Sequence, residues 1–331
     1  MKSITIVIPN YNGMKFLQGC LDSLRRQTDR DFETVMIDNG STDESVAYVR
    51  ANYPEVKIRA YHRNTGFCGA VNAGIRLSAS PYVLLLNNDV VCGPDMVKEL
   101  HRAIRERKDT FSCCAKLIGL YDPTKLDDAG DYYSALGWAF ARGKGQSSSL
   151  YNREEKVFAC CAAAAIYRRD ILEKIGLFDE RHFAYLEDID IGYRGQVYGY
   201  SNRYIPSAIV YHAGSGTSGS RHNAFKVKLA ARNGIWVIFK NMPLWQIALN
   251  APLLIAGIAI KWVYFSRKKL GKDYLAGLSE GFRELPKIGR APAGHTGAYL
   301  NIQLQLWKNC FLRVQDAILE KQSEEESIQR D

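Results

Sequence analysis

Polar side chains end an apolar run at residues 84–91, which read LLLNNDVV. Asn87, Asn88 and Asp89 follow three leucines, which predicts that they lie at the tip of a buried strand. Ligands bind at strand tips in open parallel sheets. The Asp89 carboxylate is a hard oxygen ligand suited to Mg²⁺ or Mn²⁺. Such an ion would bridge the phosphates of a nucleotide sugar and act as a Lewis acid on the leaving diphosphate; the alternative interpretation is a turn before a helix.

A cluster of carboxylates lies in the stretch YLEDIDIGYR. Glu187, Asp188 and Asp190 fall within four positions. Neighbouring carboxylates raise one another's pKa, which suits a general base. The first turn of a helix also favours acids. The two interpretations are compatible, because a helix N-terminus can present a base.

Asp38 and His212 are single candidates that also follow strand-like runs. Asp38 ends TVMID, and its carboxylate could accept the N3–H of a uracil or thymine ring, although a turn-forming or helix-start role is the simpler explanation. His212 follows SAIVY and precedes a glycine-rich loop. A lone histidine is usually structural, but beside a carboxylate metal site it becomes a candidate ligand.

The stretch RNTGFCGAVNAGI contains three glycines but not the GxGxxG fingerprint that follows a first strand. It therefore gives little support to a dinucleotide-binding fold. Gly66 would allow close backbone approach, and Asn64 and Asn72 offer amides to a sugar or ribose.

The elements that must position these residues alternate along the first 120 residues. A helix is expected to begin at a capping box, Ser41-Thr42-Asp43-Glu44, and to end before Pro54. Such alternation predicts an α/β fold with parallel strands joined by crossover helices. The other expected elements are strands at 3–8, 32–38, 56–61 and 82–87, and helices at 14–26, 68–77 and 94–107.

Beyond residue 120 the pattern is less regular. A Gly/Ser-rich loop is expected at 141–150, an apolar run spans 157–167, and a helix is expected to begin near Arg169. A loop or lid is predicted at 214–223, followed by a helix at 225–239.

The most apolar segment is 243–265. Its apolar part, 244–260, has 17 residues, fewer than the roughly 20 that a spanning helix needs. Tryptophan and tyrosine flank it, and the basic cluster Arg267-Lys268-Lys269 follows. These features favour an in-plane or re-entrant membrane helix over a buried helix or a full span.

Composition narrows the class of protein. The 331 residues are 47% hydrophobic, enough for one large domain or two smaller ones. The net charge is +9, and residues 226–321 alone carry 15 Lys and Arg against 5 Asp and Glu. A basic segment beside an apolar one favours an anionic membrane surface over nucleic acid. Eight cysteines without a CxxC motif favour reduced, buried thiols in a cytosolic protein.

Taken in order, the motifs resemble glycosyltransferase family 2, the inverting group with the GT-A fold, and most of all its bacterial rhamnosyltransferase-like branch. The ordered set is far more specific than any one motif, and it covers roughly residues 3–240. The resembling motifs are IVIPNYNG, IDNGSTD, NTGFCGAVNAGI, LLLNNDV, FDERHFAYLEDIDIGYR and VYHAGSGT.

The resemblance implies an α/β fold with a GT-A type, Rossmann-like mixed sheet flanked by helices, followed by a helical, membrane-associating extension. Residues 1–240 would form the catalytic domain, with a nucleotide-binding half at about 1–120 and an acceptor half at about 121–240. Residues 241–331 would form the basic and apolar extension.

The resemblance also implies roles for residues that match the family's motifs. Asp188 matches the catalytic base, with Glu187 beside it, Asp89 the metal-binding end of a DxD-type motif, and His212 a histidine that helps to bind the metal or the diphosphate. Asn87 stands where many members have aspartate, which weakens any claim of a second carboxylate ligand. Mg²⁺ or Mn²⁺ is the implied cofactor. The implied nucleotide-sugar-binding residues are Pro9, Tyr11, Asn12, Asp38, Asn64, Gly66, Asn72, Asn87 and Asn88, and Arg232-Asn233 matches a recurring pair to which no role is assigned.

The implied activity is metal-dependent inverting sugar transfer in cell-surface polysaccharide synthesis. Asp188 would deprotonate an acceptor hydroxyl, which attacks the anomeric carbon as the nucleoside diphosphate leaves. The implied donor is dTDP-rhamnose, with a UDP-hexose second. The implied acceptor is a lipid-linked saccharide at the cytoplasmic face of the cell membrane, where the basic extension would meet the anionic surface.

The sequence argues against three other functions. A non-catalytic nucleotide-sugar-binding subunit of a polysaccharide assembly complex would keep the fold, but the set of Asp89, Asp188 and His212 argues against it. The sequence pI of about 9.0 suggests a nucleic-acid-binding protein, but the apolar neighbours of the basic residues argue against nucleic acid as a partner. A nicotinamide oxidoreductase lacks its glycine fingerprint. The sequence leaves a homo-oligomer open.

Overall fold

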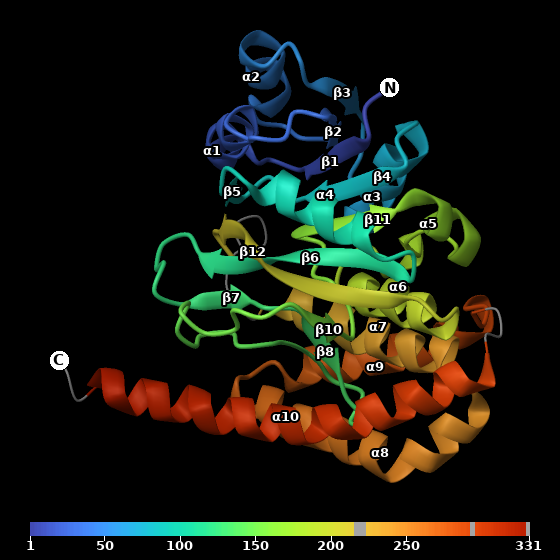
Figure 1. Cartoon of the computed structure of the whole chain (residues 1–331). Coiled ribbons are helices and arrows are strands. Elements are labelled where there is room, and N and C mark those ends of the chain that lie inside the picture. The colour runs from blue at the N-terminus through green and yellow to red at the C-terminus, as the bar shows by residue number, and fades with distance from the viewer. Residues whose placement is uncertain (215–222, 292–294, 329–331) are drawn as a thin grey trace.

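A ten-stranded mixed sheet forms the centre of the molecule in the computed structural model, which describes residues 1–214, 223–291 and 295–328 (Figure 1). The strands run in the order β10-β12-β6-β11-β4-β1-β2-β3, while β5 pairs with β12 and β7 pairs with β6. They are β1 (Ile4–Asn10), β2 (Phe32–Asp38), β3 (Lys57–Ala60), β4 (Tyr82–Leu86), β5 (Val90–Cys92), β6 (Thr110–Gly119), β7 (Leu126–Asp128), β10 (Glu155–Val157), β11 (Ala164–Arg168) and β12 (Ser201–His212), and a separate hairpin joins β8 (Asp131–Tyr133) to β9 (Ala139–Ala141).

The first half confirms the predicted alternation of strands and helices. Strands β3, β2, β1 and β4 are parallel neighbours. Leu84 and Leu86 of β4 pack into one core cluster with α1, while Val83 and Leu85 pack into another with α3. Both faces are covered, so β4 reads as a continuous apolar run. The crossover helices are α1 (Met14–Arg25), α2 (Ser45–Asn52), α3 (Gly66–Leu77) and α4 (Met96–Glu106).

The predicted capping box before α2 is wrong. Glu44 precedes the helix without a side-chain cap. The Ser41 hydroxyl instead donates a hydrogen bond to Asp38 Oδ1 at 2.6 Å and accepts one from the Asn12 backbone N–H at 2.9 Å. The serine therefore braces two neighbouring strand tips, a long-range role that the local motif could not reveal.

The middle of the chain extends the sheet beyond β4, partly through antiparallel pairings. The apolar run 157–167 contributes β11, which lies between β4 and β6. Three short helical elements follow, α5 (Arg169–Ile175), η1 (Glu180–His182) and α6 (Glu187–Val197). The loop or lid predicted at 214–223 falls mostly on residues 215–222, which lie outside the described residues.

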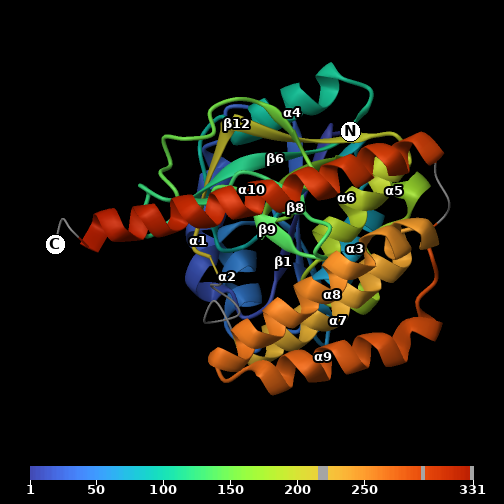
Figure 2. The same ribbon diagram turned by 90° about the horizontal axis from the view of Figure 1, so that it is seen from below.

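The C-terminal helices lie together on one side of the molecule, as the view from below shows (Figure 2). Val237 of α7 and Ile302 of α10 share a core cluster with Tyr133 and Phe158. Both helices therefore pack directly on the part of the chain that contains β8 and the residues after β10. All eight cysteines are free, as expected. The elements are α7 (Ala224–Asn241), α8 (Leu244–Arg267), α9 (Gly271–Glu284), η2 (Leu285–Lys287) and α10 (Thr296–Ile328).

Helix α8 buries two amide side chains and exposes many of its apolar side chains. Gln246 and Asn250 are fully buried, whereas Ile255 is 67% exposed. Asn250 and Gln303 of α10 exchange amide hydrogen bonds of 2.8 and 2.9 Å. Among the described residues, α8 is the one helix long and apolar enough, by length and composition only, to cross a membrane.

Replacing Asn250 with Leu should destabilise the protein, because the buried amide of Gln303 would lose its partner. An orphaned buried polar group costs about 1–3 kcal/mol. Chemical denaturation would measure the loss. The double variant Asn250→Leu/Gln303→Leu should recover part of it, because both amides are then removed, whereas the Trp307 N–H, which donates to Asn250 Oδ1 at 3.1 Å, still lacks that acceptor. A double variant that is less stable than the single one would contradict the paired-amide account.

Candidate active site

A cavity of about 660 Å³ opens where strands β1, β4 and β12 end. Its wall also includes the residues before β11 and α6 and the start of α7. Parallel strands bring their carboxyl ends to one edge of a sheet, which is why segments far apart in sequence meet here. The structure brings ten of the predicted site residues to this wall: Pro9, Tyr11, Asn64, Gly66, Asn87, Asn88, Asp89, Glu187, Asp188 and His212.

Three predicted site residues do not line the cavity. Asn12 is exposed, and its Oδ1 accepts the Thr42 backbone N–H at 2.8 Å. Asn72 is buried and tied to Phe178, donating to its carbonyl at 2.7 Å and accepting its N–H at 3.1 Å. Asp38, the last residue of β2, is buried.

A chain of amides explains why β4 ends on asparagine. Asn88 Nδ2 donates to Asn10 Oδ1 at 2.7 Å, and Asn10 Nδ2 donates to Asp38 Oδ1 at 2.9 Å. This chain joins the tips of β4, β1 and β2. It leaves no room at Gly13, where a Cβ would lie 2.0 Å from Asn88 Nδ2. Asp38 therefore fixes the shape of the cavity floor through Asn10, a residue that the sequence reasoning missed.

A second missed asparagine holds the loop before α3. Asn39 Oδ1 accepts the Thr65 backbone N–H at 2.9 Å, and its Nδ2 donates to the Gly66 carbonyl at 2.9 Å. Gly66 has φ of 79°, and a Cβ there would lie 2.5 Å from the Phe183 carbonyl oxygen. Asn10 and Asn39 both follow apolar strands, which is the signal that could have identified them.

Asp89 and His212 form a pair whose ligand atoms converge. His212 Nε2 lies 3.3 Å from Asp89 Oδ1, and its Nδ1 lies 2.6 Å from Asp127 Oδ2. Burial opposes protonation of His212, but its hydrogen bonds to the two carboxylates outweigh burial and raise its pKa to about 9. The two carboxylates therefore stabilise a positive charge at the position of the His212 imidazole.

The chemistry of this donor set fits a divalent metal ion. An imidazole nitrogen and a carboxylate oxygen face each other, and Asp127 fixes the histidine from its other nitrogen, as outer carboxylates do for metal-bound histidines. A divalent ion would take the place of the Nε2 proton. Lys144 lies 2.5 Å from the second carboxylate oxygen of Asp127 and, with His212, holds the pKa of Asp127 well below its usual range despite burial.

Glu187 and Asp188 begin α6 and face the same cavity. Burial, followed by the charge of Asp188, raises the pKa of Glu187 to about 8, and Glu187 Oε2 has no hydrogen-bond partner. Burial also raises the pKa of Asp188, but the Ile189 N–H at 2.7 Å and a hydrogen bond from Asp131 oppose that rise. The surroundings of Glu187 therefore favour its protonated form, whereas those of Asp188 include a donor that favours the ionised form.

Two further carboxyl groups lie close to Asp188. Asp128, Asp131 and Cys161 place ligand atoms within 4.8 Å of one another. Burial raises the pKa of Asp128 to about 7 and the pKa of Asp131 well above its usual range. Sequence reasoning missed this group, although LDDAGD holds three acids within five positions.

The third acid of the predicted cluster, Asp190, has a different place. It is fully buried and pairs with Arg194 at 2.8 Å and with Lys240 of α7 at 2.9 Å. Asn241 Nδ2 also donates to it at 2.9 Å. These partners hold its pKa well below the usual range despite burial. Asp190 therefore fastens α6 to α7.

The loop before Glu187 has an unusual backbone, held by the Arg232-Asn233 pair. Phe183, Tyr185 and Leu186 have φ of 63°, 73° and 66°, and left-handed non-glycine residues persist only where their surroundings hold them. Asn233 Nδ2 donates to the carbonyls of His182, Ala184 and Tyr185 at 3.0, 2.9 and 2.8 Å. Arg232 donates to the carbonyls of Arg181 and His182, both at 3.1 Å.

Comparison with known proteins identifies relatives of the chain. The family model described as glycosyl transferase family 2 matches residues 5–176. An N-acetylglucosaminyl-diphospho-decaprenol L-rhamnosyltransferase of Mycobacterium tuberculosis is 27% identical over 264 residues, covering 70% of this chain and 86% of that protein. A PGL/p-HBAD biosynthesis glycosyltransferase of Mycobacterium bovis is 30% identical over 193 residues, covering 57% and 68%.

Two solved structures share the fold at 14% identity. GalNAc-T7 with UDP, GalNAc and Mn²⁺ superposes with a TM-score of 0.60, over 89% of this chain and 59% of that one. The mannosyltransferase PcManGT of Pyrobaculum calidifontis, with GDP-Man and Mn²⁺, gives 0.54 over 85% and 87%. The mixed sheet flanked by helices is thus of the GT-A type, as the resemblance implied.

Replacing Asn233 with Asp should lower turnover without unfolding the protein. The substitution keeps the size of the side chain but removes the only amide that the three loop carbonyls share. Hydrogen exchange should then rise at 182–186 while the far-UV spectrum is kept. Asn52→Asp on the exposed face of α2 is the matched control and should change neither. Unchanged hydrogen exchange and turnover in the Asn233 variant would show that the loop keeps its conformation without the Asn233 amide.

Proposed function

The chain belongs to glycosyl transferase family 2, and from that premise we propose that it transfers a sugar, with inversion, from a nucleoside-diphosphate donor to a lipid-linked saccharide. The observation that carries the proposal is that the pair of Asp89 and His212 and the pair of Glu187 and Asp188 line one cavity. Asp89 and His212 would hold a metal ion that neutralises the leaving diphosphate. Glu187 and Asp188 would supply the base that takes the proton of the attacking hydroxyl.

We assign the general base to Asp188 and not to Glu187. The Ile189 N–H donates to Asp188 Oδ1 at 2.7 Å, which favours the ionised form of Asp188, whereas burial and the charge of Asp188 raise the pKa of Glu187 to about 8. Asp188 would take the proton of the acceptor hydroxyl as its oxygen bonds to the anomeric carbon. The bond between that carbon and the phosphate oxygen breaks at the same time, and its electron pair leaves with the diphosphate.

Asp89 and His212 would hold a divalent metal ion, with Asp127 orienting the histidine. When bound, the ion supplies Lewis acidity that neutralises charge on the leaving diphosphate. Carboxylate ligands suit Mg²⁺ and Mn²⁺ alike, and the nitrogen ligand favours Mn²⁺ of the two. The Mn²⁺ named with both structural neighbours supports the same choice.

The lining of the cavity and the relatives' names support the proposed donor and acceptor. Pro9, Tyr11 and Asn64 offer a wall for the base and ribose, with Asp38 behind it. The rhamnosyltransferase relative supports dTDP-rhamnose as donor and a sugar on a diphospho-polyprenol as acceptor. A UDP-hexose is the second choice of donor. A non-catalytic nucleotide-sugar-binding subunit remains the alternative that the activity test must separate.

The placement of α8 supports work at the cytoplasmic face of a membrane, in cell-surface polysaccharide synthesis. A helix in water buries its apolar side chains, but α8 buries Gln246 and Asn250 and exposes Leu244, Ile255 and Ile260. Large contiguous apolar surfaces mark interaction sites, and the cluster Arg267-Lys268-Lys269 at the end of α8 suits anionic headgroups.

The catalytic assignment is tested by paired variants assayed with dTDP-rhamnose and UDP-sugars. Asp188→Asn should lower kcat by about 10²–10⁴ and keep donor affinity, because the amide cannot accept the proton. Asp89→Ala should abolish both turnover and the Mn²⁺-dependent thermal stabilisation by the donor. Glu173→Gln, on the exposed face of α5, is the control. If Glu187→Gln is inactive and Asp188→Asn active, the two acids are assigned backwards, and donor binding without turnover would favour the non-catalytic subunit.

The membrane assignment is tested by sedimentation with vesicles. Each cation of the cluster 267–269 should contribute about 1 kcal/mol at an anionic surface, so changing all three to Glu should weaken binding by roughly two decades or more at low salt. Ile255→Gln should release the protein still folded, whereas Leu254→Gln, at a buried position of the same helix, should destabilise it. Equal binding of the wild-type and triple-variant proteins to anionic vesicles would rule out an electrostatic role for the cluster.

A further inference from the structure

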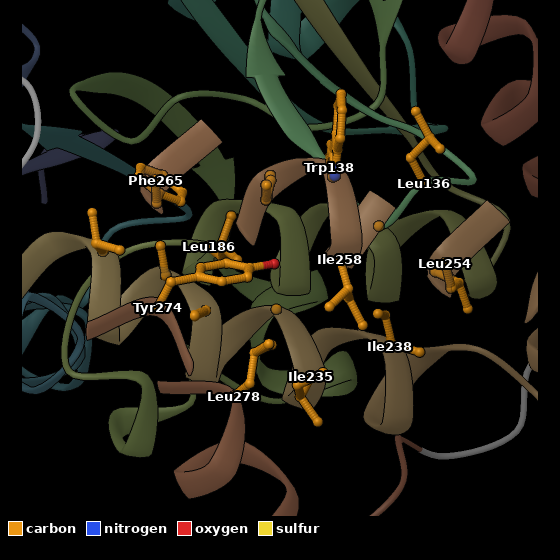
Figure 3. Close-up of a pocket in the computed structure, with 16 residues that line it drawn as sticks. Leu136, Trp138, Leu186, Ile235, Ile238, Leu254, Ile258, Phe265, Tyr274 and Leu278 are labelled. Atoms are coloured by element: carbon orange, nitrogen blue, oxygen red, sulfur yellow. The ribbon is translucent and has the colours of Figure 1, made fainter. Parts of the chain in front are cut away.

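A small apolar pocket lies between α7, α8 and α9 and is closed by the turn between β8 and β9 (Figure 3). Its volume is about 80 Å³. Figure 3 shows the ring of Tyr274 extending between Leu186 and Ile258. Ile235, Leu254 and Leu278 give the wall most of its hydrocarbon, Tyr274 and Trp138 add a hydroxyl and an indole N–H, and one lining residue is charged.

The pocket and the active-site cavity share a wall. Leu186 lines the pocket, whereas Tyr185, Glu187 and Asp188 line the cavity. A molecule in the pocket would therefore rest against the loop that carries the proposed base.

The charged group is Lys261 of α8. Its Nζ lies 5.6 Å from the centre of the Trp138 ring, and no Asp or Glu of the described residues lies within 4.0 Å of it. Burial lowers the pKa of Lys261 to about 8. Lys261 is partly covered, so its ammonium lies at the edge of the apolar wall without an acidic partner among the described residues.

The pocket opens toward the side on which α8 is apolar. Ala230 of α7 is exposed although it lines the pocket, and Ile258 and Lys261 are only partly covered. The next turns of α8 expose Ile255, Ile260 and Trp262. A chain that leaves a membrane at this helix would thus meet the amine at the entrance and hydrocarbon behind it.

We propose that this pocket receives the start of a hydrocarbon chain that carries a phosphate, with Lys261 binding the phosphate. The occupant is the lipid part of the acceptor next to its diphosphate, so the inference rests on the proposed function. The phosphate satisfies the unpaired ammonium, since charge-assisted contacts to phosphate are strong. The saccharide beyond the diphosphate then lies across Leu186, on the side of Asp188.

Calorimetry with farnesyl phosphate, farnesol and inorganic phosphate tests the site without knowledge of the acceptor sugar. The wild-type protein should bind farnesyl phosphate saturably at one site. Lys261→Met should weaken that binding by about tenfold or more and leave farnesol binding nearly unchanged, while Lys261→Arg should retain it. Ala230→Leu fills the pocket from an exposed helix position and should weaken both lipids. Lys272→Met, an exposed cation on α9, is the control and should change neither.

Several outcomes would overturn the site. Equal affinities in the wild-type, Lys261→Met and Ala230→Leu proteins would place the lipid on the outer face of α8, and loss of farnesyl phosphate binding in Ile255→Gln alone would do the same. Binding of inorganic phosphate as tight as farnesyl phosphate would make the pocket irrelevant. The proposed function fails separately: a protein that binds farnesyl phosphate through Lys261 but transfers no sugar keeps the pocket and loses the activity.

Discussion

Three left-handed, non-glycine residues stand directly before the candidate base, and the function of the site depends on what holds them. Each left-handed residue costs on the order of 1–3 kcal/mol, so the loop would relax if it were free. Asn233 prevents this by donating hydrogen bonds to the carbonyls of His182, Ala184 and Tyr185. The held backbone turns Tyr185 toward the polar cavity and Leu186 toward the apolar pocket, so one constraint shapes two binding surfaces.

Helix α7 carries this constraint and links the active site to the C-terminal helices. Asn233 holds the loop, Lys240 pairs with Asp179 and Asp190 at 2.9 Å, and Ile235 packs on Tyr274 of α9. Helix α7 thus contacts both the loop before Asp188 and the C-terminal helices, and a truncation before α8 would expose the face of α7 that packs on α9.

The sequence predicted those features whose signal is local. The strands and helices of the first 120 residues follow from periodicity, and Asn87, Asn88 and Asp89 follow from the abrupt end of β4. It could not reveal Asp127 or Asp131, because their importance arises from contacts with His212 and Asp188, more than 50 positions away. The failed capping box has the same cause, since Ser41 serves Asp38 across the sheet and not its own helix.

A site for an anionic diphosphate has to limit its own negative charge, and this accounts for so many carboxyl groups near Asp188. Burial raises the pKa of Glu187 to about 8, the pKa of Asp128 to about 7 and the pKa of Asp131 well above its usual range. Asp127 is ionised but neutralised by His212 and Lys144. Asp188 differs from these neighbours, because the Ile189 N–H donates to its carboxylate and opposes the rise in its pKa that burial causes. Protonated neighbours would thus let one carboxylate act as a base beside a diphosphate without repelling it.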